Sequence, residues 1–117
     1  MKESELKYTC EQYLSTLQNM GKLIFLRLNS GNLIIGEGAA KRRVCCCPPG
    51  TSDNIVVLPG KTIFVEYKGE KGKQTRDQKA FEKLVEEQGH HYWLVYDFDT
   101  FKWELDLMLD KIEECLR

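Results

Sequence analysis

Two carboxylates and one amine, residue types suited to metal-assisted chemistry, stand at the ends of two neighbouring apolar segments. Asp53 opens the segment 53–58, and Glu66 and Lys68 end the segment 61–68. Both segments are rich in β-branched residues and are predicted to form strands. Glu66 and Lys68 are two positions apart, so on a strand their side chains lie on the same face.

The tight turn Pro59-Gly60 joins the two predicted strands into an antiparallel hairpin. Asp53 and Glu66 lie at equal distances from this turn, one on each side, so the hairpin places them opposite each other. The sequence thus predicts that Asp53, Glu66 and Lys68 meet at one end of an apolar sheet.

Charges beside a buried sheet are costly unless they are paired or bind a metal ion. Carboxylate oxygens are hard ligands that suit Mg²⁺ or Mn²⁺. A divalent ion held by Asp53 and Glu66, with the backbone carbonyl of Tyr67 as a further ligand, would ionise an attacking water and neutralise a scissile phosphate. Lys68 would position that water or stabilise the transition state. The alternative is a surface hairpin on which Glu66 and Lys68 form a weak, solvated pair.

The elements that must position these residues are those of an α/β fold, a mixed sheet flanked by helices. Hydrophobic periodicity and turn residues predict, in chain order, a helix over 4–20 with Ser4 as N-cap, a buried strand over 22–28, a short strand over 32–35, a loop over 36–52, the hairpin strands over 53–58 and 61–68, a loop over 69–75, a helix over 76–88, a strand over 91–96, a turn over 97–100 and a helix over 101–116. A loop as long as 36–52 in so small a domain is usually functional or disordered.

The composition predicts one globular domain over residues 1–117, with 42% hydrophobic and 30% charged residues. The net charge of -1 shows no bulk basicity, but Lys41, Arg42 and Arg43 form one local basic cluster, and Lys71 and Lys73 belong to another. Such clusters can bind phosphates even when the total charge is near zero. No apolar run approaches the roughly 20 residues of a membrane span, and the N-terminus lacks the pattern of a signal peptide. We therefore expect a cytoplasmic protein whose five cysteines are reduced.

Several short motifs, taken together in their order and spacing, resemble the core of the virus-type replication-repair nuclease (VRR-NUC) domains of the PD-(D/E)XK class. They are Gly50-Thr51-Ser52-Asp53, Pro59-Gly60, Ile63-Phe64-Val65-Glu66-Tyr67-Lys68, Lys71-Gly72-Lys73, Gln78-Lys79-Ala80-Phe81 and Gly89-His90. The similarity extends from Gly50 to Tyr96 and is weaker back to Ser4. Ser52 stands where the family usually has proline, a departure that the wider class tolerates.

The resemblance implies a restriction-endonuclease-like fold and an Mg²⁺- or Mn²⁺-dependent hydrolase that cleaves phosphodiester bonds in DNA. By motif match Asp53 and Glu66 are metal ligands, Lys68 is catalytic, and Gln78 faces the same site. The simpler interpretation of Gln78 is a solvated helix residue.

The family also places a glutamate of its first helix near the metal. Glu5 matches this position best, and Glu11 and Glu3 are alternatives. Acidic residues near a helix N-terminus are favoured by the helix dipole in any case.

The resemblance further implies a homodimer in a phage or bacterial setting, similar to structure-specific nucleases that resolve four-way (Holliday) junctions. The apolar stripe of the last helix is wider than one buried face requires, and the first helix adds two tyrosines. The interface candidates are Trp103, Leu107, Met108, Ile112, Tyr8 and Tyr13. Rival functions are a catalytically silent DNA-binding or assembly module and an RNA-directed nuclease.

The basic residues are the candidates for DNA contact. Lys41, Arg42 and Arg43 lie in the loop that leads to Asp53, and Lys71 and Lys73 follow Lys68. The alternative for the first run is a solvated charge cluster.

Other notable residues have ordinary structural interpretations. The triplet Cys45-Cys46-Cys47 lacks the spacing of a zinc site. Cys10 and Cys115 are predicted core residues. One of His90 and His91 is expected to point into the sheet and the other outward. Trp93 and Trp103 are expected in the core or at an interface.

Overall fold

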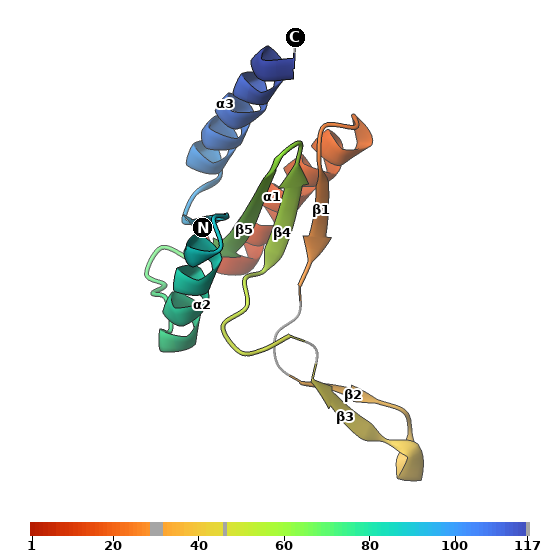
Figure 1. The fold of residues 1–117 in the computed structure, drawn as a ribbon. Helices are drawn as coiled ribbons and strands as arrows, with labels where there is room; N and C mark the ends of the chain where they lie inside the picture. Colours follow the sequence, from red (N-terminus) through yellow and green to blue (C-terminus); the bar gives the residue numbers. More distant parts are fainter. Residues whose placement is uncertain (29–31, 46, 117) are drawn as a thin grey trace.

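The computed structural model describes residues 1–28, 32–45 and 47–116 and shows a mixed α/β architecture (Figure 1). The elements are α1 (Glu3–Asn19), β1 (Ile24–Arg27), β2 (Asn32–Ile35), the short 3₁₀ helix η1 (Gly38–Ala40), β3 (Arg42–Cys45), β4 (Asn54–Leu58), β5 (Lys61–Tyr67), α2 (Arg76–Glu87), β6 (His91–Val95) and α3 (Phe98–Leu116).

The body of the molecule is a four-stranded sheet in the order β1-β4-β5-β6, and β2 and β3 form a separate two-stranded hairpin. Strands β5 and β6 run parallel, whereas β1–β4 and β4–β5 are antiparallel pairs. The predicted class, a mixed sheet flanked by helices, is therefore confirmed. Within the described ranges, none of the helices combines the length and apolar character that a bilayer span requires.

The hydrophobic core lies between one face of the sheet and the helices α1 and α3. Its most buried members are Leu6, Cys10 and Leu14 on α1, Val56, Ile63, Val65 and Tyr67 on the sheet, and Phe101 and Leu105 on α3. They recur at helical spacing on the helices and alternate along the strands, so the apolar pattern of the sequence suffices to build this layer. The prediction that Cys10 is a core residue is confirmed, because its side chain is fully buried.

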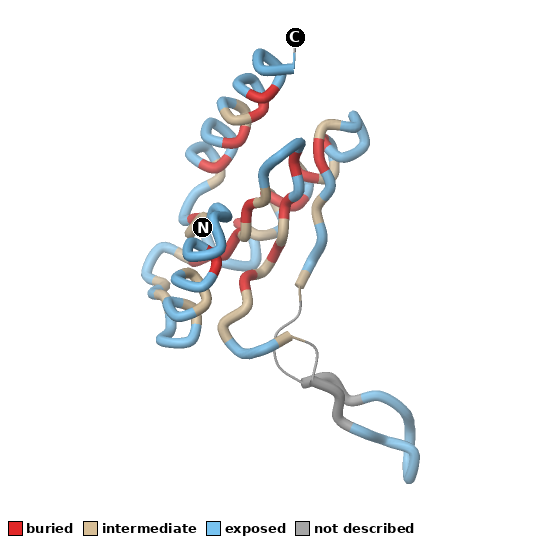
Figure 2. The backbone as a smooth tube through the Cα atoms, viewed as in Figure 1, coloured by how far each residue is buried: buried red, intermediate tan, exposed pale blue. Residues whose placement is uncertain are grey.

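The opposite face of the sheet is only partly covered. Phe64 packs edge-to-face against Phe81 of α2, with ring centroids 5.5 Å apart, so α2 covers the β5 side of this face. On β1, Ile24 is 56% exposed and Leu26 is 55% exposed. Figure 2 shows β1 as a mostly exposed strand of the sheet. The prediction of a buried strand here is wrong. Helix α2 packs against β6, and β1 is the strand at the opposite edge of the sheet, so α2 does not cover it.

The predicted loop over 36–52 contains a strand, which corrects that prediction. Strand β3 pairs antiparallel with β2, from Asn32↔Cys45 to Ile35↔Arg42. Gly36 permits the connection, because it has φ 91° and a Cβ there would lie 2.5 Å from the carbonyl oxygen of Ala40. Residues 32–45 thus form a hairpin, here called the arm, that extends away from the four-stranded sheet (Figure 1).

Two helix starts differ from the prediction. The N-cap of α1 is Lys2, which makes no side-chain cap hydrogen bond, and Ser4 lies inside the first turn. Helix α3 begins at Phe98 rather than Phe101, because the Asp97 carboxylate accepts a hydrogen bond from the Thr100 backbone N–H at 2.9 Å. The side-chain oxygen satisfies an otherwise free N–H, so the predicted turn becomes helix.

Two other predicted placements are wrong. Cys115 is exposed, so it does not belong to the core. Both His90 and His91 are exposed, so neither is buried in the sheet; one ends the turn before β6 and the other begins that edge strand. Trp103 is 66% exposed, which excludes the core and leaves its alternative placement at an interface as a prediction. Trp93 does pack partly buried against the core, as predicted.

Three of the interface candidates are engaged within the chain. Ile112 is buried in the core, and Met108 is partly buried and packs against it. The Tyr13 ring packs edge-to-face on Phe98, and its hydroxyl donates a hydrogen bond to Asp106. The exposed candidates on the helices are Tyr8, Trp103 and Leu107.

Candidate active site

The β4–β5 hairpin brings the two predicted carboxylates together. The strands pair from Leu58↔Lys61 to Asn54↔Val65, so Asp53 lies beside Glu66 one step further along. Asp53 Oδ2 accepts a hydrogen bond from the Tyr67 backbone N–H at 2.9 Å. The negative charge of Asp53 raises the pKa of Glu66, as expected for two neighbouring carboxyls. The predicted opposition of the two residues is therefore present.

Glu66 is a nearly buried carboxylate, with 5% of its surface exposed. Its Oε1 accepts a hydrogen bond from Gln78 Nε2 at 3.0 Å and lies 4.0 Å from Lys68 Nζ. Its Oε2 is buried and finds no hydrogen-bond partner among the described residues. Burial first, and then the charge of Asp53, raise the pKa of Glu66 to about 8, while Lys68 acts in the opposite direction. A hydrogen bond between the Glu66 and Asp53 carboxyls acts in the same direction as burial, so the metal-free site holds a shared proton where a cation would bind.

Gln78 is held in position by the N-terminus of α2. Its backbone N–H donates to Thr75 Oγ1 at 3.1 Å, and its side-chain Oε1 accepts from the Thr75 N–H at 2.9 Å, which completes a capping box. The amide nitrogen is then left to donate to Glu66. The predicted placement of Gln78 at the site is thus observed, and the cap fixes its orientation.

Lys68 is 8% exposed, because the following turn folds back over it. Gly72 N–H donates to Gly69 O at 2.9 Å, and a Cβ on Gly72 would lie 3.2 Å from the Lys68 Cβ. The aliphatic stem of Lys68 is therefore covered while its ammonium group lies near Glu66. Lys71 and Lys73, on either side of Gly72, are exposed.

The segment before Asp53 packs against the start of α2. Gly50 has φ 90°, and a Cβ there would overlap the Asp77 carbonyl group and lie 2.8 Å from the Asp77 Cβ. Ser52, at the position where the resembled family has proline, is 1% exposed and donates a hydrogen bond to Asn54 O at 3.1 Å. The approach of Gly50 to Asp77 joins the segment that carries Asp53 to the helix that carries Gln78.

The three glutamates of the first helix have different surroundings. Glu5 is exposed. Glu11 is buried, and its two oxygens meet Asn54 Nδ2 at 2.8 Å and Arg27 Nε at 3.2 Å. Glu3 is exposed, but its charge contributes to the raised pKa of Glu66. Of the two exposed glutamates, Glu3 is thus the one whose charge acts on the pair, and its backbone lies beside Gly69, next to Lys68.

A buried polar network that the sequence did not reveal lies behind the site. Tyr67 Oη donates to Asn54 Oδ1 at 2.6 Å, and Asn54 Nδ2 donates to Glu11 at 2.8 Å. Burial raises the pKa of the Tyr67 phenol above its ordinary value, so the phenol stays protonated and remains a donor. Asn54 adjoins Asp53, and Tyr67 adjoins Glu66, so the network fixes both backbones. The sequence signal that could have indicated this network is the position of two polar residues, Asn54 and Tyr67, directly after the two acidic residues in otherwise apolar strands.

The donor set suits a divalent cation. Asp53 and Glu66 supply two carboxylates, one with a buried oxygen that lacks a partner among the described residues, and the Tyr67 carbonyl adjoins them in the chain. In the described part of the chain, no group of three or more His, Cys, Asp or Glu side chains forms a ready metal cage. Mg²⁺ usually keeps several waters and uses one or two protein carboxylates, so this set meets its needs.

The other predicted binding residues lie apart from the carboxylates in the chain. Lys41 and Arg42 are exposed on the arm, whereas the side chain of Arg43 lies outside the described residues. Of the cysteine triplet, Cys47 is a partly buried free thiol; Cys46 and the side chain of Cys45 also lie outside the described residues.

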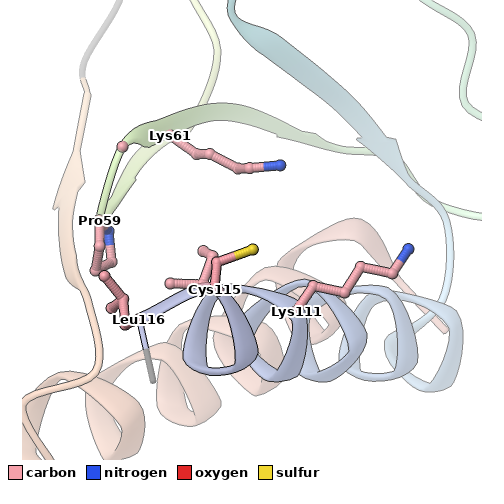
Figure 3. A pocket seen from close by; sticks show the side chains of 7 residues that line it. Pro59, Lys61, Lys111, Cys115 and Leu116 are labelled. Atoms are coloured by element: carbon pink, nitrogen blue, oxygen red, sulfur yellow. The ribbon is translucent and has the colours of Figure 1, made fainter.

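A separate apolar pocket of about 380 Å³ opens at the other end of the β4–β5 hairpin (Figure 3). It is lined by Pro59, Gly60, Lys61, Lys111, Ile112, Cys115 and Leu116. The length of the strands separates this pocket, at the hairpin turn, from Asp53 and Glu66, so the two features are distinct.

Comparison with known proteins adds no relative: no family model and no curated protein matches the chain. A functional assignment therefore depends on the motif and on the geometry of the carboxylate site.

The approach of Gly50 to α2 predicts a specific sensitivity. Gly50→Ala and Gly60→Ala both place an L side chain at positive φ, which costs about 1–2 kcal/mol, but a Cβ on Gly60 meets nothing within 4 Å. We expect Gly50→Ala to lower the free energy of unfolding by a further ~1–3 kcal/mol, because it overpacks the contact with Asp77. Urea denaturation of both variants measures the difference, and equal losses of stability would contradict the contact.

Proposed function

We propose that the chain is a divalent-metal-dependent DNA endonuclease with a restriction-endonuclease-like fold. The observation that carries the proposal is Glu66: a nearly buried carboxylate with an oxygen that has no partner among the described residues, beside Asp53 and 4.0 Å from Lys68. Two acidic side chains held side by side, one of them nearly buried, are costly in a purely structural arrangement, because burial and their mutual repulsion both disfavour the charged forms. A cation held between the two carboxylates would relieve that cost.

Each residue at the site then has a role in phosphodiester hydrolysis. Asp53, Glu66 and the Tyr67 carbonyl would hold the metal ion, which supplies Lewis acidity toward a water and a phosphate oxygen. Lys68 orients the attacking water and stabilises the negative charge that develops on the phosphate. Gln78 donates to Glu66 Oε1 and thereby leaves Oε2 available to the cation.

The substrate class is supported by the resemblance of the motifs to VRR-NUC domains. The aspartate, the Glu66-Tyr67-Lys68 run and the glutamine of the next helix come together in this chain at one end of the sheet. We propose DNA as the substrate, with a branched structure such as a four-way junction preferred, and a homodimer as the active unit. RNA is the competing substrate that an assay must include.

The first test is cleavage. We expect cutting of DNA with Mg²⁺ or Mn²⁺ and none with EDTA, across junction, flap, single-strand and linear duplex substrates, with an RNA substrate alongside. Asp53→Asn, Glu66→Gln and Lys68→Met should each reduce the rate about 100-fold or more, because each removes a group that acts on the transition state. DNA binding should persist in all three, as gel shift in EDTA would show.

Glu104→Gln and Lys111→Met are the matched controls, because both side chains are exposed on α3 away from the carboxylates. Wild-type turnover by any of the three site variants would remove that residue from the mechanism. Cleavage of RNA alone would replace the proposed substrate.

The arm is the proposed second contact with the DNA backbone. Replacement of Lys41, Arg42 and Arg43 by alanine should weaken binding and flatten its salt dependence by roughly 0.9 in log–log slope for each phosphate that the variant no longer neutralises. The control replaces Lys22, Lys83 and Lys111, which changes the net charge equally. Binding measured across a salt series decides the matter, and identical slopes for both triple variants would show that the arm residues are merely solvated.

The homodimer is tested through the exposed apolar residues of α3. Trp103 and Leu107 are 66% and 39% exposed and lie one helical turn apart, so they form one surface. We expect sedimentation at micromolar concentration to show a dimer, and Trp103→Glu with Leu107→Glu to shift it toward monomer. A monomer throughout that still cuts both strands of a junction would refute the dimer.

A further inference from the structure

A second lysine lies at the carboxylate pair and belongs to none of the sequence motifs. Lys7 Nζ of α1 is 3.7 Å from Asp53 Oδ1. Glu3, one turn earlier on the same helix, also acts electrostatically on Glu66. One face of α1 therefore lies along the site, and Lys7 is the cation that this face provides.

The two oxygens of Asp53 have different partners. Oδ2 accepts the Tyr67 backbone N–H at 2.9 Å, and that donor is fixed by the β5 strand. Oδ1 instead pairs with Lys7 Nζ, which lies at the end of a long, flexible side chain. A metal ion can therefore gain Oδ1 by displacing the Lys7 ammonium, without breaking the backbone hydrogen bond.

Lys7 also differs from Lys68 in its access to substrate. The Lys7 side chain is 37% exposed, whereas the Lys68 side chain is 9% exposed and covered by the turn at Gly72. Lys68 can act within the site, but an ammonium group that must meet a polyanion arriving from solvent needs exposure. Of these two lysines, Lys7 is the one placed to contact the DNA backbone beside the cut.

We infer that Lys7 occupies the cation position at Asp53 in the metal-free protein and, once displaced by the metal ion, binds a DNA phosphate next to the scissile bond. The inference rests on the proposed nuclease function and adds a phosphate-binding residue to it. It couples the two ligands: metal binding frees the lysine, and the freed lysine favours DNA.

If Lys7 had a structural role, Lys7→Met would lower the free energy of unfolding of the metal-free protein. We expect no such loss, because a partly exposed ion pair at this separation contributes little to stability. The free energy of unfolding of Lys7→Met should be close to that of Lys111→Met, the exposed control on α3.

The test compares wild type, Lys7→Met, Lys7→Arg and Lys111→Met as purified full chains. Calorimetric titration with Mn²⁺ in the absence of DNA should show about fivefold tighter binding for Lys7→Met, because a competing charge is gone. DNA affinity measured with Ca²⁺ across a salt series should fall for Lys7→Met, with a log–log slope lower by about 0.9. Lys7→Arg should restore the slope.

Two negative outcomes are distinguishable. If wild type binds Mn²⁺ and cuts DNA but Lys7→Met matches Lys111→Met in metal affinity and salt slope, the role of Lys7 is refuted and the nuclease proposal stands. If wild type gives no heat with Mn²⁺ and cuts nothing, the proposed function itself fails and the role of Lys7 falls with it.

Discussion

The site depends on the pairing of β4 with β5 and on one hydrogen bond that extends it. The Asp53 carboxylate accepts a hydrogen bond from the Tyr67 backbone N–H just beyond the last pair of the two strands, Asn54 and Val65. A side chain thus provides the next hydrogen bond to β5 after the backbone pairing of β4 ends. This bond holds Asp53 next to Glu66 and forces two carboxylates into a space where one of them is nearly buried. The chemistry proposed for the protein is a consequence of that enforced proximity.

Two supports keep this crowded arrangement of charges in place. Behind the site, Tyr67, Asn54 and Glu11 form a buried network in which each polar group satisfies another, so the backbones next to the carboxylates cannot relax apart without breaking hydrogen bonds. Beside it, the capping box of α2 orients Gln78 toward Glu66. Among the described residues one oxygen of Glu66 is left over, because the supports hold the neighbouring groups in other bonds.

The differences between prediction and structure share a cause: each depends on a partner that the local pattern does not reveal. The composition of residues 22–28 is typical of a buried strand, yet β1 is exposed on one face because α2 covers that face only near β5 and β6. The apolar part of β3 is short and follows two arginines, so the strand is recognisable only once its partner β2 is known. The early start of α3 arises from one cap, Asp97, which the sequence pattern assigns to a turn.

The sequence by itself determined most of the elements, the hairpin register and the meeting of Asp53, Glu66 and Lys68, because a two-residue turn and strict alternation leave one way to pair the strands. It also indicated Gln78 through its motif position. The tertiary structure alone decided which acid of α1 lies near the pair, that Lys7 contacts Asp53, and which residues form the network behind it. Those depend on how α1 is rotated and placed against β5, and that placement comes from packing the whole core rather than from any local pattern.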